Sequence, residues 1–183
     1  MKILITGGLG LIGGRLGSFL SKRGHLVTLV TRGSSREFQK NFSSNGLINI
    51  RTIDWNDFNK IESLCASHEL IIHAAGMNAN ECLLDPKVSV SSAIFNATQL
   101  IKACKNSNVQ KFIYLSSAHV YSSSLEGLIN EDTPALNEHP YAKAHLARLL
   151  QSGLHEFNSQ QNELGIAAVE HILEKNFIGE GEN

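Results

Sequence analysis

The sequence lacks the features that mark nucleic-acid binding or membrane insertion. Its 16 lysines and arginines nearly balance its 17 aspartates and glutamates, and no basic stretch is long enough to follow a phosphate backbone. No apolar run approaches the ~20 residues that cross a bilayer. The apolar start Met1–Thr6 is interrupted at Gly7 rather than continuing as a signal sequence. We therefore expect a cytoplasmic protein with neither nucleic acid nor membrane as a partner.

Cysteine is scarce, and its spacing excludes two further classes of protein. Cys65, Cys82 and Cys104 have neither the spacing of metal ligands nor that of a disulfide framework. We therefore expect three buried thiols and no metal site. The 183 residues, 42% of them hydrophobic, suffice for one globular domain with its own core.

Short runs rich in β-branched residues alternate with longer helical patterns, which indicates a parallel sheet covered on both faces. Five runs have strand length: Lys2–Thr6, Leu26–Thr31, Ile48–Ile53, Leu70–Ala74 and Lys111–Ser116. Helical patterns cover Leu11–Arg23, Pro86–Asn106 and Pro140–Leu150, and the polar segments Ser34–Asn45 and Ser122–Glu138 are predicted to be loops. The sequence therefore predicts an α/β protein.

Three glycines, Gly7, Gly10 and Gly13, stand between the first strand and the first helix. Glycines allow a tight turn and close approach to a diphosphate, and the amino terminus of a helix offers N–H groups and partial positive charge. Leu11 and Ile12 begin that helix and would contribute amides. This combination of strand, turn and helix predicts a Rossmann-like doubly wound sheet that binds a nicotinamide dinucleotide.

The end of the second strand bears on the choice of cofactor. An acidic residue there would bind the ribose 2′-hydroxyl of NAD, but the sequence continues without a carboxylate, as Thr31, Arg32, Gly33, Ser34, Ser35 and Arg36. Guanidinium groups and hydroxyls can enclose a 2′-phosphate, so NADP is preferred and NAD is possible. The alternative is a solvated loop with ordinary surface arginines.

Four motifs in this order resemble the extended short-chain dehydrogenase/reductase family, of the nucleotide-sugar epimerase, dehydratase and reductase type. They are the turn Thr6–Gly13, His73-Ala74-Ala75-Gly76, Ser116-Ser-Ala-His-Val-Tyr121 and Pro140-Tyr-Ala-Lys-Ala-His145. Asp54, followed by Trp55, matches the family's acidic residue that contacts adenine. The resemblance covers residues 1–150 and implies cofactor contacts at Asp54, Trp55, Ala74, Ala75, Gly76, Ser116, Tyr141 and His145.

The resemblance also implies a catalytic Ser117 and a catalytic Tyr141. A tyrosinate would take or return the proton of a sugar hydroxyl while the serine orients the same oxygen. In the family a lysine stands four residues after the tyrosine, and here that residue is His145, which we include in the catalytic set. Lys143 lies two residues along and points to another side of the helix. Without the resemblance, Ser117 would be interpreted as a strand-end cap and Tyr141 as a packed aromatic.

A second departure narrows the chemistry. Family dehydratases carry an Asp-Glu pair where this sequence has Ala118 and His119, so dehydration is disfavoured, and these two positions are expected to face substrate. The leading prediction is a nucleotide-sugar epimerase or reductase. The alternatives are a weak or inactive NADP-binding sensor or partner protein, and a reductase of small carbonyl compounds.

The end of the chain is short for this family, whose carboxyl-terminal substrate domain would be largely missing. We predict a dinucleotide-binding domain over residues 1–150 and a remnant of the substrate region over 151–183. No convincing sixth strand follows Leu150, and Gly165–Lys175 is interpreted as a helix. The helices from Pro86 and Pro140 are the pair that relatives use for dimerisation. A homodimer is therefore expected, using Val88, Val90, Ile94, Leu100 and Ile101, although packing on the sheet explains most of these residues equally well.

Overall fold

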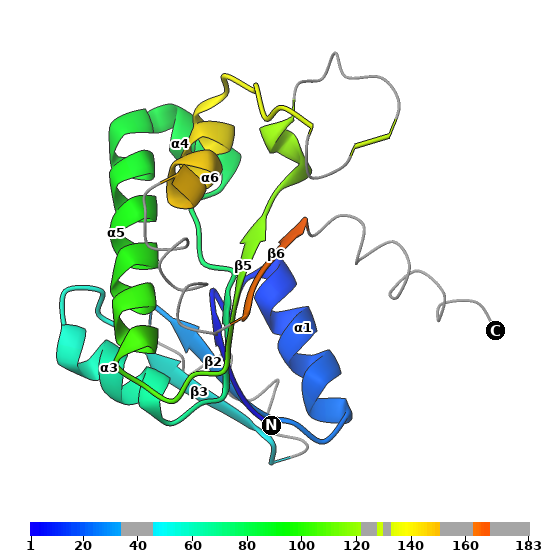
Figure 1. Cartoon of the computed structure of the whole chain (residues 1–183), viewed down its shortest axis with the longest axis vertical. Helices are drawn as coiled ribbons and strands as arrows, with labels where there is room; N and C mark the ends of the chain where they lie inside the picture. Colours follow the sequence, from blue (N-terminus) through cyan, green and yellow to red (C-terminus); the bar gives the residue numbers. More distant parts are fainter. Residues whose placement is uncertain (34–45, 122–127, 130–132, 151–162, 169–183) are drawn as a thin grey trace. The chain divides into compact units, whose positions relative to one another are not determined.

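The apolar runs of the sequence form the strands of a parallel sheet (Figure 1). They are β1 (Lys2–Thr6), β2 (Leu26–Thr31), β3 (Ile48–Thr52), β4 (Leu70–His73) and β5 (Lys111–Ser116). Neighbours in the order β3-β2-β1-β4-β5 pair in parallel, and β6 (Glu163–Ala168) lies next to β5. The predicted α/β class and its Rossmann-like sheet are confirmed.

The helices predicted to begin at Leu11, Pro86 and Pro140 are also found, with ends that follow local signals. The helical segments are α1 (Leu11–Lys22), α3 (Phe58–Ala66), α4 (Ala79–Leu84), α5 (Pro86–Lys105), the 3₁₀ turn η1 (Ala118–Val120) and α6 (Pro140–Leu150). Pro86 and Pro140 each occupy the first helical position, where a missing N–H costs nothing. The sequence reasoning did not predict α3 or α4.

The structure is a computed structural model that describes residues 1–33, 46–121, 128–129, 133–150 and 163–168. It has two units, the first built mainly from Met1–Gly76 with Phe95–Tyr114, and the second mainly from Met77–Ile94 with Leu115–Gln151. The predicted loop Ser34–Asn45 and most of the predicted remnant lie outside the described residues. The proposed boundary at residue 150 therefore stays a prediction.

Within the first unit, helices cover both faces of the sheet (Figure 1). Adjacent residues of a strand point to opposite faces of the sheet, so Thr28 and Leu29 of β2 point toward the helical layers on the two different faces. Leu29 lies under α1, because a Cβ built on Gly17 would be 2.5 Å from Leu29 Cδ2. Thr28 faces the other layer, where its hydroxyl bonds His68 just beyond α3.

The segment after Leu150 corrects one prediction. Residues 163–168 form β6, so the predicted absence of a sixth strand is wrong, and so is the predicted helix over residues 165–168. The run that follows Glu163 is short and apolar, and the periodicity of such a run does not distinguish a strand from a helix. The rest of that predicted helix lies outside the described residues.

All three cysteines are buried free thiols, as predicted. Cys65 of α3 and Cys104 of α5, far apart in sequence, are hydrogen-bonded neighbours. That bond and burial raise the pKa of the Cys104 thiol well above its ordinary value. A high pKa keeps the Cys104 thiol protonated and unreactive, so its role is to fill the core.

Two of the residues expected to support a dimer lie in the core of the first unit. Leu100 and Ile101 are buried there, whereas Val88 in the first turn of α5 is exposed. The homodimer stays a prediction.

In the described part of the chain, no helix has the length and apolarity that crossing a membrane requires. The same residues hold no cluster of three side chains able to bind a metal ion.

His68 gives the fold a predicted dependence on pH. Its Nε2 lies 2.7 Å from Thr28 Oγ1, its Nδ1 lies 2.7 Å from the Leu64 carbonyl oxygen, and burial lowers its pKa below the ordinary 6.5. A depressed folded-state pKa gives stability that is present above pH 6.5 and is lost as pH falls through the folded value. Urea denaturation should show the free energy of unfolding falling on acidification, and His68→Gln should reduce this fall. An equal fall in His68→Gln and in the control His25→Gln would contradict the assignment.

Candidate functional site

The glycine turn joins the carboxyl end of β1 to α1, and its backbone is tied to the neighbouring strand. Gly7 has a φ of 68°, a left-handed conformation that favours glycine. The Gly10 N–H donates to the Gly7 carbonyl at 2.9 Å, and the Gly8 N–H donates to the Val30 carbonyl of β2 at 3.0 Å. The turn is therefore tight and lies at the carboxyl edge of the sheet.

The amino terminus of α1 opens from this turn. Gly10 is its N-cap, no side chain caps the helix, and its first turn holds no acidic residue. The first N–H to bond within the helix is that of Gly14, which donates to the Gly10 carbonyl at 2.9 Å. The preceding amides, of Leu11, Ile12 and Gly13, are those that a helix leaves for an outside acceptor. Leu11 is 70% exposed, so the terminus is not covered by that side chain.

Two glycines allow a close approach of backbone segments that a side chain would block. A Cβ built on Gly13 would lie 2.3 Å from the Gly7 carbonyl oxygen, and one built on Gly7 would lie 2.8 Å from the Ala74 oxygen and the Ala75 nitrogen. These contacts place the predicted motif Ala74–Gly76, after β4, directly beside the turn. The open amides and the cradle that only glycine allows fit a diphosphate.

Thr6, which the sequence reasoning did not single out, links the two motifs. Its hydroxyl lies 2.6 Å from His73 Nδ1 and accepts the Ala75 N–H at 3.3 Å. Its carbonyl accepts the Ala74 N–H at 3.2 Å. A threonine ending an otherwise apolar buried strand was the available signal, because a buried hydroxyl needs hydrogen-bond partners.

The ends of β2 and β3 lie at the same edge of the first unit. The Ile53 N–H donates to the Thr31 carbonyl at 2.9 Å, and Thr31 Oγ1 accepts the Gly33 N–H at 3.3 Å. The Arg32 side chain is exposed beside them. Three other residues predicted to hold a 2′-phosphate, Ser34, Ser35 and Arg36, lie outside the described residues.

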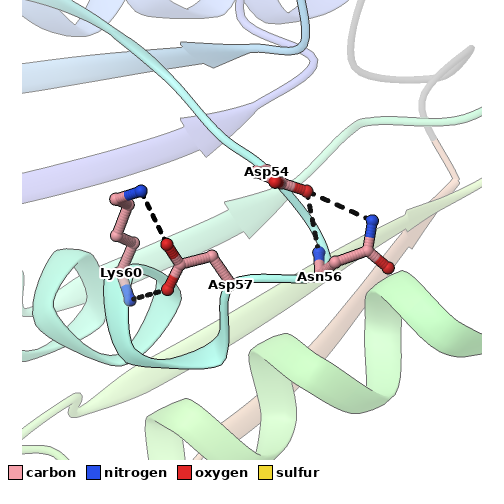
Figure 2. Close-up of polar contacts among 4 residues, drawn as sticks. All are labelled: Asp54, Asn56, Asp57 and Lys60. Carbon is pink, nitrogen blue, oxygen red and sulfur yellow. Dashed lines mark hydrogen bonds and ion pairs between the residues drawn. The ribbon is translucent and has the colours of Figure 1, made fainter.

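Two carboxylates follow β3, and they differ in what they bind (Figure 2). Asp57 caps α3 by accepting the Lys60 N–H at 3.1 Å and pairs with the Lys60 ammonium at 2.6 Å, and these bonds lower the pKa of Asp57. Asp54 is exposed, and its Oδ1 accepts from the backbone N–H and the side-chain Nδ2 of Asn56. Among the described residues no hydrogen bond reaches Asp54 Oδ2, which leaves that oxygen for a ligand.

Trp55 follows Asp54 and differs from it in exposure. Its side chain is buried, and its ring meets His73 edge-on with centroids 5.9 Å apart. The indole Nε1 has no hydrogen-bond partner among the described residues. A buried indole leaves only the Trp55 backbone for a cofactor contact.

The second unit holds the residues predicted to perform chemistry. Ser117 caps η1, because its Oγ accepts the His119 N–H at 3.2 Å. A hydroxyl that accepts one bond still has its own hydrogen to donate, so a structural cap and a substrate contact are compatible. Ser116, just before it, is also buried, and its Oγ has no partner among the described residues. Ala118 and His119 form the next two positions of η1.

Tyr141 lies in the first turn of α6, and its ring contacts two imidazole rings. The centroids of Tyr141 and His145 are 4.5 Å apart at 61°, and those of Tyr141 and His119 are 6.0 Å apart at 87°. His145 is 8% exposed. Lys143 is exposed and pairs with Glu138, so it is directed away from this group, as the helical spacing predicts.

A small apolar cluster packs against Tyr141. Its buried members are Cys82 of α4, Ala93 of α5 and Ala144 of α6, and the partly buried Met77, Val90 and Tyr141 pack on it. The small alanines let the helices approach closely, which fixes the start of α6 against its neighbours.

Comparison with known proteins agrees with this arrangement. Residues 3–162 match the sequence profile of the NAD dependent epimerase/dehydratase family. The chain is 27% identical to UDP-glucose 4-epimerase of Bacillus subtilis, covering 94% of this chain and 52% of the relative. It is 28% identical to UDP-N-acetyl-alpha-D-glucosaminuronate decarboxylase of Bacillus cytotoxicus, covering 72% of this chain and 41% of the relative.

A solved structure shows the same fold. The structure of UDP-glucose 4-epimerase from Bifidobacterium longum in complex with NAD+ and UDP superposes with a TM-score of 0.80 at 24% identity, covering 92% of this chain and 52% of that one. The chain thus spans about half the length of that protein and of the Bacillus subtilis relative. On the profile match over most of its length, this chain belongs to the NAD dependent epimerase/dehydratase family.

Proposed function

We propose that this chain binds a nicotinamide dinucleotide at the β1–α1 turn and interconverts a hydroxyl and a ketone on a nucleotide sugar, as an epimerase or reductase. The observation that carries the proposal is the uncapped amino terminus of α1, with the amides of Leu11, Ile12 and Gly13 preceding the first intrahelical bond. Such a terminus binds the negative charge of a diphosphate through N–H donors and the helix dipole.

Other residues at this edge complete the proposed cofactor site. Asp54 Oδ2 would accept the adenine amino group, and the backbone of Ala74–Gly76 would line the wall beside Gly7. The family is described as NAD dependent, so NAD is the cofactor we propose first. The exposed Arg32 supports NADP as the other possibility, because a guanidinium binds a 2′-phosphate through charge-assisted bonds.

Tyr141 would transfer the proton of the reacting sugar hydroxyl, and Ser117 would orient that hydroxyl. When bound, the nicotinamide supplies a carbon that accepts and returns hydride. The Tyr141 phenol would exchange a proton with the reacting hydroxyl of the sugar, and the Ser117 hydroxyl would donate to the same oxygen. The positions that follow Ser117 bear no carboxylate, because they are Ala118 and His119, so this proposal does not include elimination of water.

The residue that replaces the family lysine favours a second candidate function. His145 is a buried imidazole against the Tyr141 ring, at the position where the lysine would place an ammonium group. Without that ammonium a tyrosinate lacks a source of positive charge beside it, so a dinucleotide-binding protein without turnover is the alternative. A reductase of small carbonyl compounds would use the same groups.

The two functions are separated by measuring binding and turnover on the same preparation. The chain is mixed with UDP-, GDP- and dTDP-sugars and small carbonyl compounds, with NAD or NADP in both redox states, and products are identified by NMR. Epimerised or reduced sugar would support the proposed enzyme. Tight dinucleotide binding with no product from any substrate would contradict it and favour the binding protein.

A further inference from the structure

An unusual residue caps the helix that begins with Tyr141. His139 precedes Pro140, and its carbonyl accepts the first intrahelical bond, from the Lys143 N–H at 3.0 Å. Its ring Nδ1 accepts the Tyr141 N–H at 3.1 Å. These are the two bonds of an N-cap residue, a role usually filled by Ser, Thr, Asp or Asn. The imidazole therefore holds the backbone of Tyr141 directly.

Asn137 holds this cap on the turn that carries Ser117. Its Oδ1 accepts the His139 N–H at 2.9 Å. Its backbone N–H donates to the Val120 carbonyl at 3.1 Å, and its Nδ2 donates to the Tyr121 carbonyl at 3.3 Å. Val120 ends η1, the turn that the Ser117 hydroxyl caps. Four hydrogen bonds thus lead from η1 through Asn137 and His139 to the backbone of Tyr141.

This path shortens the connection between two residues of the proposed active site. Ser117 and Tyr141 are separated by 24 positions in the sequence, including the segment 122–132. The hydrogen bonds of Asn137 to the Val120 and Tyr121 carbonyls connect the two ends of this interval directly. A fixed spacing between a proton donor and a proton acceptor matters, because small displacements of reacting groups lower the rate strongly. Cross-linking the two elements by local hydrogen bonds provides such a spacing.

We infer that Asn137 and His139 are positioning residues that fix Tyr141 relative to the Ser117 turn. The inference rests on the proposed function for its catalytic consequence, while its structural part stands on the hydrogen bonds alone. His139 acts only through an unprotonated Nδ1 that accepts the Tyr141 N–H. Asn137 acts through its side-chain oxygen, which accepts the His139 N–H, and through its side-chain nitrogen, which donates to the carbonyl of Tyr121 at the end of η1.

The test compares His139→Ala, which removes the acceptor, with His139→Asn, which supplies the usual N-cap oxygen. The Tyr141 ring resonances are followed in protein carrying ¹³C-labelled tyrosine, with Tyr141→Phe used for assignment and the other tyrosines as internal references. Tyr141 amide exchange with deuterium and, where turnover is found, kcat and the dinucleotide Kd are measured in parallel. In His139→Ala we expect exchange about fivefold to tenfold faster, a shifted Tyr141 ring signal and a lower kcat at unchanged Kd.

His139→Asn should restore all of these values, and Asn137→Ala should reproduce the losses. Asn137→Asp keeps the oxygen that receives His139 but loses the donor to Tyr121, so it should lie between Asn137→Ala and the native chain. The exposed Asn59→Ala on α3 is the matched control and should change nothing. A native-like Tyr141 ring signal in His139→Ala, or a normal kcat despite a shifted signal, would overturn the inference. If the native chain shows no turnover, the proposed function fails, and the ring signal and amide exchange still decide the positioning.

Discussion

Replacing Gly13 with alanine is expected to weaken dinucleotide binding by about tenfold or more, which corresponds to a loss of about 1.4 kcal/mol. The added Cβ would lie 2.3 Å from the Gly7 carbonyl oxygen, which is itself held by the Gly10 N–H, so the turn must deform. Deforming the turn moves the amides that would bind the diphosphate. Binding is measured by calorimetry and by the fluorescence of Trp55, the sole tryptophan of the sequence.

Gly24→Ala provides the control for a general glycine effect. Gly24 has a φ of 83°, and a Cβ there would have no neighbour within 4 Å. Alanine at that position is expected to cost roughly 1–2 kcal/mol of folding stability through backbone strain while leaving the dinucleotide Kd unchanged. If Gly13→Ala binds as well as the native chain, the assignment of the turn is wrong. If both variants lose binding equally, the loss reflects destabilisation.

Replacing Tyr141 with phenylalanine is expected to lower kcat by about 100-fold or more with little change in dinucleotide Kd, because general acid–base catalysis contributes on this scale.

Replacing His145 with lysine is expected to raise kcat. A free phenol titrates near 10, so use as a base at pH 7 requires roughly 4 kcal/mol of help for its anion. A lysine one helical turn away supplies positive charge, so His145→Lys should raise kcat about tenfold, or produce turnover where the native chain has none.

Tyr121→Phe is the matched control, because Tyr121 is also half-buried in the second unit and its bond to Asn137 uses only the backbone carbonyl. Its kcat should stay within about threefold of the native value, since the change removes only a hydroxyl outside the proposed site and is expected to alter free energies by about 0.5 kcal/mol or less. Equal losses in Tyr121→Phe and Tyr141→Phe would remove the catalytic role of Tyr141. Loss of kcat in His145→Lys would contradict the proposed role of positive charge.

The sheet was predictable because its signals are local. The bounds of β1, β2, β5 and α6 agree with the sequence pattern, since β-branched runs and Pro140 define them without reference to distant residues. The two short helices that were missed also carried local signals. Asp57 caps α3, and Asn78 with Glu81 forms a capping box at α4, a pattern readable as an asparagine followed three residues later by glutamate.

The candidate site was predictable in part for a related reason. The glycines of the turn lie close together in sequence, so their meaning depends only on the strand before and the helix after them. The bonds from Thr6 to His73 and from Asn137 to Val120 join residues far apart in sequence, and only the folded backbone brings them together. Likewise β6 was missed because its run of apolar residues has no period that identifies a strand.

The measurement that tests the central claim most directly is calorimetric titration of the native chain with NAD+, NADH, NADP+ and NADPH. We expect saturable heat with one dinucleotide per chain, and a free energy of unfolding raised by about 2.7 kcal/mol at a free ligand concentration 100 times Kd. Tighter binding of the phosphorylated forms would support the role of Arg32. No heat and no stabilisation with any of the four would contradict the claim that the amides after Gly10 bind a diphosphate.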